Sequence, residues 1–232
     1  MLVTLLSTLR QTLGALRMTP ASILRDGRFS IVNLCAFAHN WLFRHRSMLM
    51  TTRDTPTAYG SVSRLNHWIG ALFVLTLLAI GLYFGDMPRG AEKTFWRKLH
   101  IAIGTVAMLF LLFRVWWRVR ATSPLALPQK PSLQALSKLV HAVLLIGIVV
   151  MVVSGPLIQW MGGRPFGIFD LVSFPSPFAK SELWHDRMEV LHGWTAWVLI
   201  YAIGLHLLAV IKHQFFDRDN ILARMTGRGH RG

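Results

Sequence analysis

Three uncharged apolar stretches constrain the fold of this 232-residue chain more than any other feature. Leu65–Phe84 and Leu139–Ile158 each hold 20 residues without Lys, Arg, Asp or Glu, and Val190–Ile211 holds 22. A helix of about 20 apolar residues spans the hydrocarbon core of a bilayer. A soluble domain of this size could not bury them, since 53% of the chain is hydrophobic and only 15% is charged. The sequence therefore excludes a soluble enzyme, a secreted disulfide scaffold and a disordered regulator.

A fourth apolar segment, Leu99–Val119, carries Arg114 and Arg118 near its end, where long side chains can reach the membrane interface. We therefore expect an all-α integral membrane protein, a four-helix bundle occupying residues 65–216. The predicted helices cover about 65–84, 99–119, 139–158 and 190–211.

The formal net charge of +15 is concentrated in loops and tails rather than in one patch. Arg114–Lys138 has five basic residues and no acid, whereas Gly162–Glu189 has three basic residues and four acids. This asymmetry follows the positive-inside rule better than it fits nucleic-acid binding, which we exclude. It places both termini and the connection between the second and third helices in the cytoplasm.

The segments that flank the bundle are basic. Residues 1–50 hold six Arg against one Asp, and two interpretations stay open: an interfacial amphipathic segment, or a start codon assigned too early. Residues 51–64 are expected to form a cytoplasmic lead-in, and residues 217–232 a basic cytoplasmic tail.

Four histidines in the spanning segments form a pattern with chemical meaning. His192 and His206 are 14 residues apart, which is about 21 Å along a helix and nearly the same face. The alternating helix directions place His67 level with His206 near the inner face, and His100 level with His192 near the outer face. Because an intramembrane His is costly unless it is paired or ligated, we expect two His–His pairs stacked across the membrane.

Imidazole pairs without carboxylate or thiolate suit six-coordinate haem b, the usual ligation for electron transfer. A zinc site would need four ligands, and the lone Cys35 excludes thiolate-based centres. A proton pump would be expected to carry embedded acids, and the spanning runs contain none. The residues therefore favour two haem b groups, with the iron of one held by His67 and His206 and that of the other by His100 and His192.

Three motifs give the chain a resemblance to a known family: RLNHW at the first helix, KLHIAIG at the second, and LHGW followed by IGLHLLAVIKHQFFDRDNIL at the fourth. Over roughly Tyr59–Met225 the chain resembles the prokaryotic cytochrome b561 family, and in particular small di-haem superoxide:ubiquinone oxidoreductases. The resemblance implies haem ligation at the same four histidines and a place in the bacterial inner (plasma) membrane. It also implies electron transport in the respiratory chain, by an oxidoreductase or an electron carrier.

The resemblance implies that superoxide is oxidised at the outer haem and that ubiquinone is the electron acceptor. Basic residues just before His100 would attract a small anion, although neutralisation of haem propionates or lipid contact explains them equally well. These are Arg89, Lys93, Arg97 and Lys98. On the inner side, His213, His141 and Arg64 are candidates to contact a quinone or a haem propionate.

Two alternatives stay open. The chain could be a cytochrome b membrane-anchor subunit that links a dehydrogenase to the quinone pool. The loop Gln159–Glu189, with four phenylalanines, would then be the docking surface: Phe166, Phe169, Phe174 and Phe178. A non-redox, His-lined metal transporter is the alternative from another class, and it predicts a protein without haem absorbance.

Overall fold

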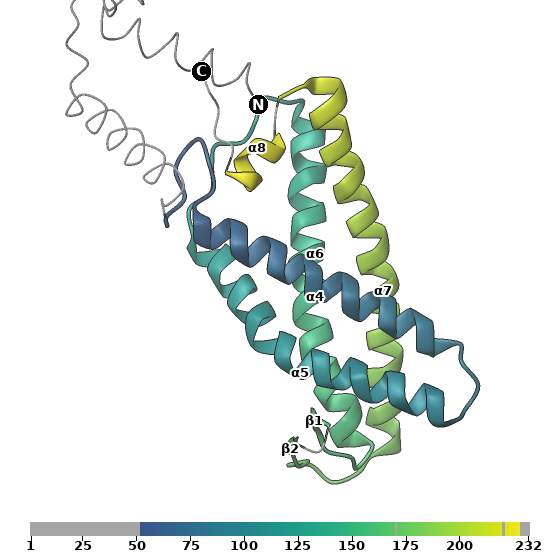
Figure 1. Cartoon of the computed structure of the whole chain (residues 1–232). Helices are drawn as coiled ribbons and strands as arrows, with labels where there is room; N and C mark the ends of the chain where they lie inside the picture. The colour runs from purple at the N-terminus through teal and green to yellow at the C-terminus, as the bar shows by residue number, and fades with distance from the viewer. Residues whose placement is uncertain (1–51, 170, 220, 228–232) are drawn as a thin grey trace, which may run out of the picture. The chain divides into compact units, whose positions relative to one another are not determined.

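The computed structural model of the chain describes residues 52–169, 171–219 and 221–227, so the predictions for residues 1–50 lie outside it. Within the described residues, four helices are long and apolar enough to cross a membrane, as predicted. Figure 1 shows them as two antiparallel pairs that run at an angle to each other. The helices are α4 (Ser61–Gly85), α5 (Ala91–Arg120), α6 (Pro131–Met161) and α7 (Glu182–Ile211).

Each helix is longer than its predicted span. The hydropathy pattern detects only the part in hydrocarbon, whereas the backbone continues as a helix into the polar interface. Pro131 begins α6 in the first turn, where its missing N–H costs nothing. Ser181 caps α7 by accepting a hydrogen bond from the Trp184 backbone N–H. At its other end α7 runs into a π-helical segment, η1 (Lys212–Asp217).

The bundle has a small core and an apolar exterior. Neighbouring helices in the chain pack on each other, α4 on α5, α5 on α6 and α6 on α7. Ala107, Leu111 and Ile148 are buried at the centre, with Phe73 and Leu77 packed against them. Large side chains such as that of Leu109 stay 70% exposed, an arrangement that suits a surface in contact with lipid.

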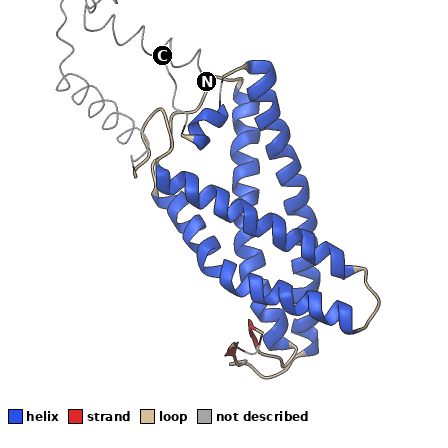
Figure 2. Cartoon of the chain, viewed as in Figure 1, coloured by secondary structure: helices blue, strands red, loops and turns tan. Residues whose placement is uncertain are grey.

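A short β-hairpin interrupts the otherwise helical structure, in the connection between α6 and α7 (Figure 2). Its antiparallel strands are β1 (Phe166–Ile168) and β2 (Val172–Phe174). The hairpin packs on α5, where the Thr105 hydroxyl donates to the Gly167 carbonyl at 3.2 Å. Gly167 is required, because a Cβ there would lie 1.9 Å from the Val172 carbonyl oxygen. This end of the bundle is called the hairpin end.

The opposite end carries a short helix, α8 (Ile221–Thr226), in the described part of the predicted basic tail. The Trp68 indole N–H donates to the Met225 carbonyl at 3.1 Å, and the Arg224 guanidinium donates to the Leu125 carbonyl at 2.9 Å. These bonds fasten α8 to α4 and to the connection between α5 and α6. This end is called the α8 end.

The contact between α6 and α7 yields a stability prediction. A Cβ at Gly147 would lie 2.6 Å from Leu199 Cδ2, and Leu199 is 2% exposed. Gly147→Val should therefore force the two helices apart and lower stability by about 1–3 kcal/mol, measured as thermal unfolding in detergent. Gly85→Val is the control, because nothing lies within 4 Å of that position. Equal melting temperatures for the two variants would contradict this packing.

Candidate functional site: two histidine pairs

The first histidine pair lies at the hairpin end. The ring centroids of His100 on α5 and His192 on α7 are 6.3 Å apart. The Ser154 hydroxyl on α6 lies 2.8 Å from His192 Nδ1, which leaves Nε2 as the free nitrogen of that ring. His100 Nδ1 is buried and has no hydrogen-bond partner in the described part of the chain. Three different helices therefore position this pair.

The second pair lies toward the α8 end. The centroids of His67 on α4 and His206 on α7 are also 6.3 Å apart. His141 on α6 stands edge-on to His206, with a centroid separation of 5.3 Å. The Ser137 carbonyl accepts a hydrogen bond from His141 Nδ1 at 2.7 Å, so His141 Nε2 is the nitrogen that can accept. The geometry thus brings together the four histidines paired by sequence reasoning and places a fifth beside one pair.

The separation within each pair fits a metal ion held between two imidazoles. A metal–imidazole bond is about 2 Å long and a ring nitrogen lies about 1 Å from its centroid, so two axial imidazoles have centroids about 6 Å apart. A direct hydrogen bond between the rings would bring the centroids to about 5 Å. Both pairs have the larger separation.

The backbone arrangement leaves room for a flat group at the same places. Close packing joins α4 to α5, α5 to α6 and α6 to α7, whereas α7 approaches α4 and α5 much less closely. The histidine pairs bridge these two wider separations, from α4 to α7 and from α5 to α7. Residues and spacing together therefore fit a macrocycle with one axial imidazole on each side.

Sequence reasoning missed a residue at the second pair, Arg114. Instead of extending to the membrane interface, its guanidinium lies 3.1 Å from His67 Nδ1 and donates to the Asn66 carbonyl at 3.3 Å. Gly70 makes room for it, since a Cβ there would lie 2.6 Å from Arg114 Cδ. No carboxylate among the described residues pairs with Arg114. The sequence did contain a signal for this role, because Arg114 is a charged residue in an apolar segment that offers no acidic residue to pair with it.

The other candidates on the inner side have different surroundings from those expected. His213 Nδ1 lies 2.5 Å from Asp219 Oδ2 and 3.3 Å from Asp217 Oδ2, so two carboxylates engage this ring. Arg64 lies against Gly227, just after α8. Of the three candidates named for a quinone or propionate, His141 is the one in contact with a histidine pair.

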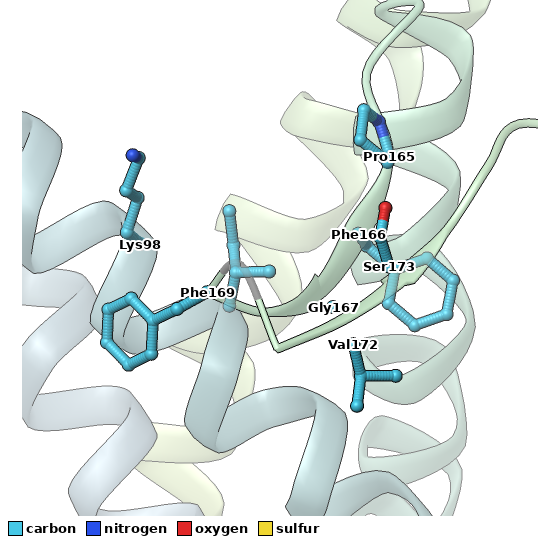
Figure 3. Close-up of a pocket in the computed structure, with 8 residues that line it drawn as sticks. Lys98, Pro165, Phe166, Gly167, Phe169, Val172 and Ser173 are labelled. Carbon is cyan, nitrogen blue, oxygen red and sulfur yellow. The ribbon is translucent and has the colours of Figure 1, made fainter.

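The four basic residues before His100 divide into two groups. Lys93 donates to the Gly85 and Met87 carbonyls at 3.0 and 2.8 Å, so it caps the end of α4. Arg89, Arg97 and Lys98 are exposed at the hairpin end. Lys98 also borders a pocket of about 190 Å³ between α5 and the hairpin, with Phe166 and Phe169 among its lining residues (Figure 3).

A membrane four-helix bundle with two facing histidine pairs is the architecture expected of a transmembrane cytochrome. The chain belongs to the prokaryotic cytochrome b561 family, whose sequence model matches residues 58–228. Membership implies that it binds b-type haem and resides in a bacterial membrane, and electron transfer is the activity that such a cytochrome supports.

Named relatives cover most of the chain. Cytochrome b561 homolog 2 of Escherichia coli (strain K12) is 31% identical over 186 residues, which is 77% of this chain and 96% of that protein. A probable superoxide oxidase, CybB of Yersinia pestis, is 26% identical over 68% of this chain and 90% of that protein. Cytochrome b561 homolog 1 of Escherichia coli (strain K12) is 27% identical over 70% of this chain and 93% of that protein.

Proposed function

We propose that the chain transfers electrons across the membrane through two bis-histidine haem b groups, from superoxide at the outer face to ubiquinone. His67 and His206 would hold one haem, and His100 and His192 the other. Each bound haem supplies a one-electron carrier. The observation that carries the proposal is the equal 6.3 Å separation of two histidine pairs, spaced along α7 by 14 residues or about 21 Å.

The overall reaction balances with two molecules of superoxide for each quinone. Each superoxide loses one electron and leaves as O₂. Ubiquinone takes up two electrons and two protons to become the quinol. A b-type centre carries one electron at a time, so the two superoxide molecules need not be oxidised at the same moment. Because the histidine pairs lie within the membrane, they would keep the electron away from water.

The residues around the pairs have distinct tasks in this proposal. Ser154 binds Nδ1 of His192 and so would orient this ring, which leaves Nε2 as the nitrogen that could hold the iron. Arg114 can only donate, so His67 Nδ1 accepts the hydrogen bond from its guanidinium. Iron binding at His67 Nε2 would leave a hydrogen on Nδ1. Arg114 would then be free to pair with a haem propionate. This ion pair would compensate the negative charge of the propionate at membrane depth.

The proposed orientation has the hairpin end outside and the α8 end in the cytoplasm. The positive-inside pattern of the connections supports it. Exposed Arg89, Arg97 and Lys98 would then lie at the outer end of the bundle, the end that holds the His100–His192 pair. A field of this sign raises the encounter rate of a small anion such as superoxide. The similarity to a probable superoxide oxidase is a second, independent support.

A second candidate is a membrane-anchor subunit, favoured by one feature of the hairpin end. Phe169, Phe174 and Phe178 are between 43% and 49% exposed and could contact a dehydrogenase. Phe166 is not available for this role, since it is buried at 7% and stacks on Phe174 at 5.0 Å. A superoxide pulse separates the candidates, because an anchor subunit would keep its haems oxidised.

The first prediction from the proposed function concerns the haem ligands. Purified wild-type protein should contain two haem b groups per chain, and His67→Ala or His100→Ala should contain one, because each removes an axial ligand of a single pair. A pyridine haemochrome assay gives the ratio. His213→Ala is the control and should retain both haems. Two haems in either pair variant would refute the assignment.

The second prediction tests the support of His192. Ser154→Ala should weaken haem binding at the hairpin end by about 10–100-fold, because the hydrogen bond that orients the ring is lost. Haem titration of the haem-depleted protein measures the affinity. Thr195→Val is the matched control. Thr195 is also buried, but its hydroxyl donates to the Leu191 carbonyl within its own helix. An unchanged affinity in Ser154→Ala would show that Ser154 does not orient His192.

The third prediction concerns superoxide. Arg97→Glu combined with Lys98→Glu should slow haem reduction by superoxide about 10-fold or more at low ionic strength, with both haems present. Stopped-flow absorbance after a superoxide pulse measures the rate. The matched pair Lys130→Glu with Lys138→Glu makes the same charge change in exposed residues near the α8 end and should leave the rate unchanged. Equal rates for both double variants would reject electrostatic steering.

A further inference from the structure

We propose that the hairpin end also carries a binding site for a divalent transition-metal ion, formed by His185, Asp186 and Glu189 at the start of α7. One ligand atom from each residue lies within 4.8 Å of the other two. These residues take no part in either histidine pair. The proposal depends on neither the haem assignment nor the superoxide reaction, and it can fail or stand independently of both.

His185 is held in the state that a metal ligand requires. The Ile158 carbonyl lies 2.8 Å from His185 Nδ1. Because a carbonyl only accepts, Nδ1 must donate, and the lone pair of the neutral ring is on Nε2. Metal-binding histidines generally donate their second ring N–H to a carbonyl or carboxylate in this way. Nε2 in turn faces Glu189, 4.0 Å from Oε2.

The two carboxylates are free to bind a cation. In the described part of the chain, neither Asp186 nor Glu189 has a Lys or Arg within ion-pair distance. The nearby basic groups are engaged elsewhere. Arg187 stacks on the Trp184 ring at 5.4 Å, and Lys180 pairs with Glu182 at 3.1 Å.

Arg164 is the basic residue on the Nδ1 side of His185. Both groups border the space next to Gly162, and Arg164 Nε donates to Gln159 Oε1 at 3.4 Å. Among the described residues, the Arg164 guanidinium is not within ion-pair distance of Asp186 or Glu189.

The ligand set indicates the type of metal. One imidazole and two carboxylates match zinc, which binds nitrogen and oxygen at about 2 Å and keeps a position for water when the protein supplies three ligands. Bonds of this length place ligand atoms about 3–4 Å apart. The 4.0 Å between His185 and Glu189 therefore needs only a small side-chain adjustment, and Glu189 is exposed enough to make it.

A second cluster in the chain serves as an internal comparison. Near the α8 end, His213, Asp217 and Asp219 also each place one ligand atom within 4.8 Å of the other two. Asp217 is already paired with a cation, because Lys212 Nζ lies 2.5 Å from Asp217 Oδ2. Asp219 also accepts from the Ile221 backbone N–H and from His213. A metal would have to displace these partners, so this cluster is not proposed as a site.

The position of the site relates it to the histidine pair at the hairpin end. His185 precedes His192 by seven residues, which is nearly two helical turns on the same face and about 10 Å along α7. A bound cation would add positive charge between water and the His100–His192 pair.

Equilibrium dialysis of the purified full-length protein against Zn²⁺, after treatment with a chelator, tests the proposal. Zinc per chain is measured by elemental mass spectrometry. Asp186→Asn and Glu189→Gln should each weaken binding at one site by about 10-fold or more relative to wild type, because each removes an anionic ligand without changing side-chain size. His213→Ala should bind zinc as the wild type does.

The two carboxamide variants keep the test independent of folding. His185→Ala would also remove the bond to Ile158, whereas Asp186 and Glu189 are exposed and make no hydrogen bond to the backbone in the described residues. If all variants bind zinc equally, the zinc is bound by other groups in the chain. Identical binding curves for wild type, Asp186→Asn and Glu189→Gln would overturn the proposal, as would a loss of binding confined to His213→Ala.

Discussion

At two places along α7, one toward each end, two imidazoles face each other across a wide gap between helices. The rest of the structure depends on this constraint. Without a metal ion, each pair would place polar ring nitrogens at membrane depth with incomplete hydrogen bonding, and His100 Nδ1 has no partner among the described residues. The helices pack closely as α4 on α5 and α6 on α7, and the two histidine pairs bridge α4 to α7 and α5 to α7. The bundle is therefore organised around the positions of the pairs more than around its small apolar core.

The surrounding polar groups support the pairs from outside. Ser154 binds one ring nitrogen of His192, and Arg114 approaches the corresponding nitrogen of His67. Both come from helices other than that of the histidine they contact. The two pairs differ under the proposed haem ligation: the Ser154 contact would be compatible with iron at His192 Nε2, whereas the Arg114 contact would have to change if iron bound at His67 Nε2. Haem binding should therefore require a structural adjustment at the His67–His206 pair and none at the His100–His192 pair.

Much of this arrangement could be predicted from the sequence, because it depends on periodicity and helix direction. The 14-residue spacing of His192 and His206 and the alternating topology were enough to pair all four histidines. The hairpin was not predictable, since its strands are only three residues long and depend on contact with α5. Arg114 was misjudged for a similar reason: snorkelling and inward pairing look alike in a sequence, and the choice depends on space left by Gly70. The role of Lys93 as a cap likewise required the three-dimensional position of the end of α4.

An equilibrium redox titration of the purified wild-type protein, followed by the absorbance of reduced b-type haem, tests the central claim most directly. Two bis-histidine sites in different surroundings, one beside Arg114 and one beside Ser154, predict two one-electron steps of equal amplitude. A titration whose full amplitude corresponds to one haem per chain, or a protein without haem absorbance, would contradict the account.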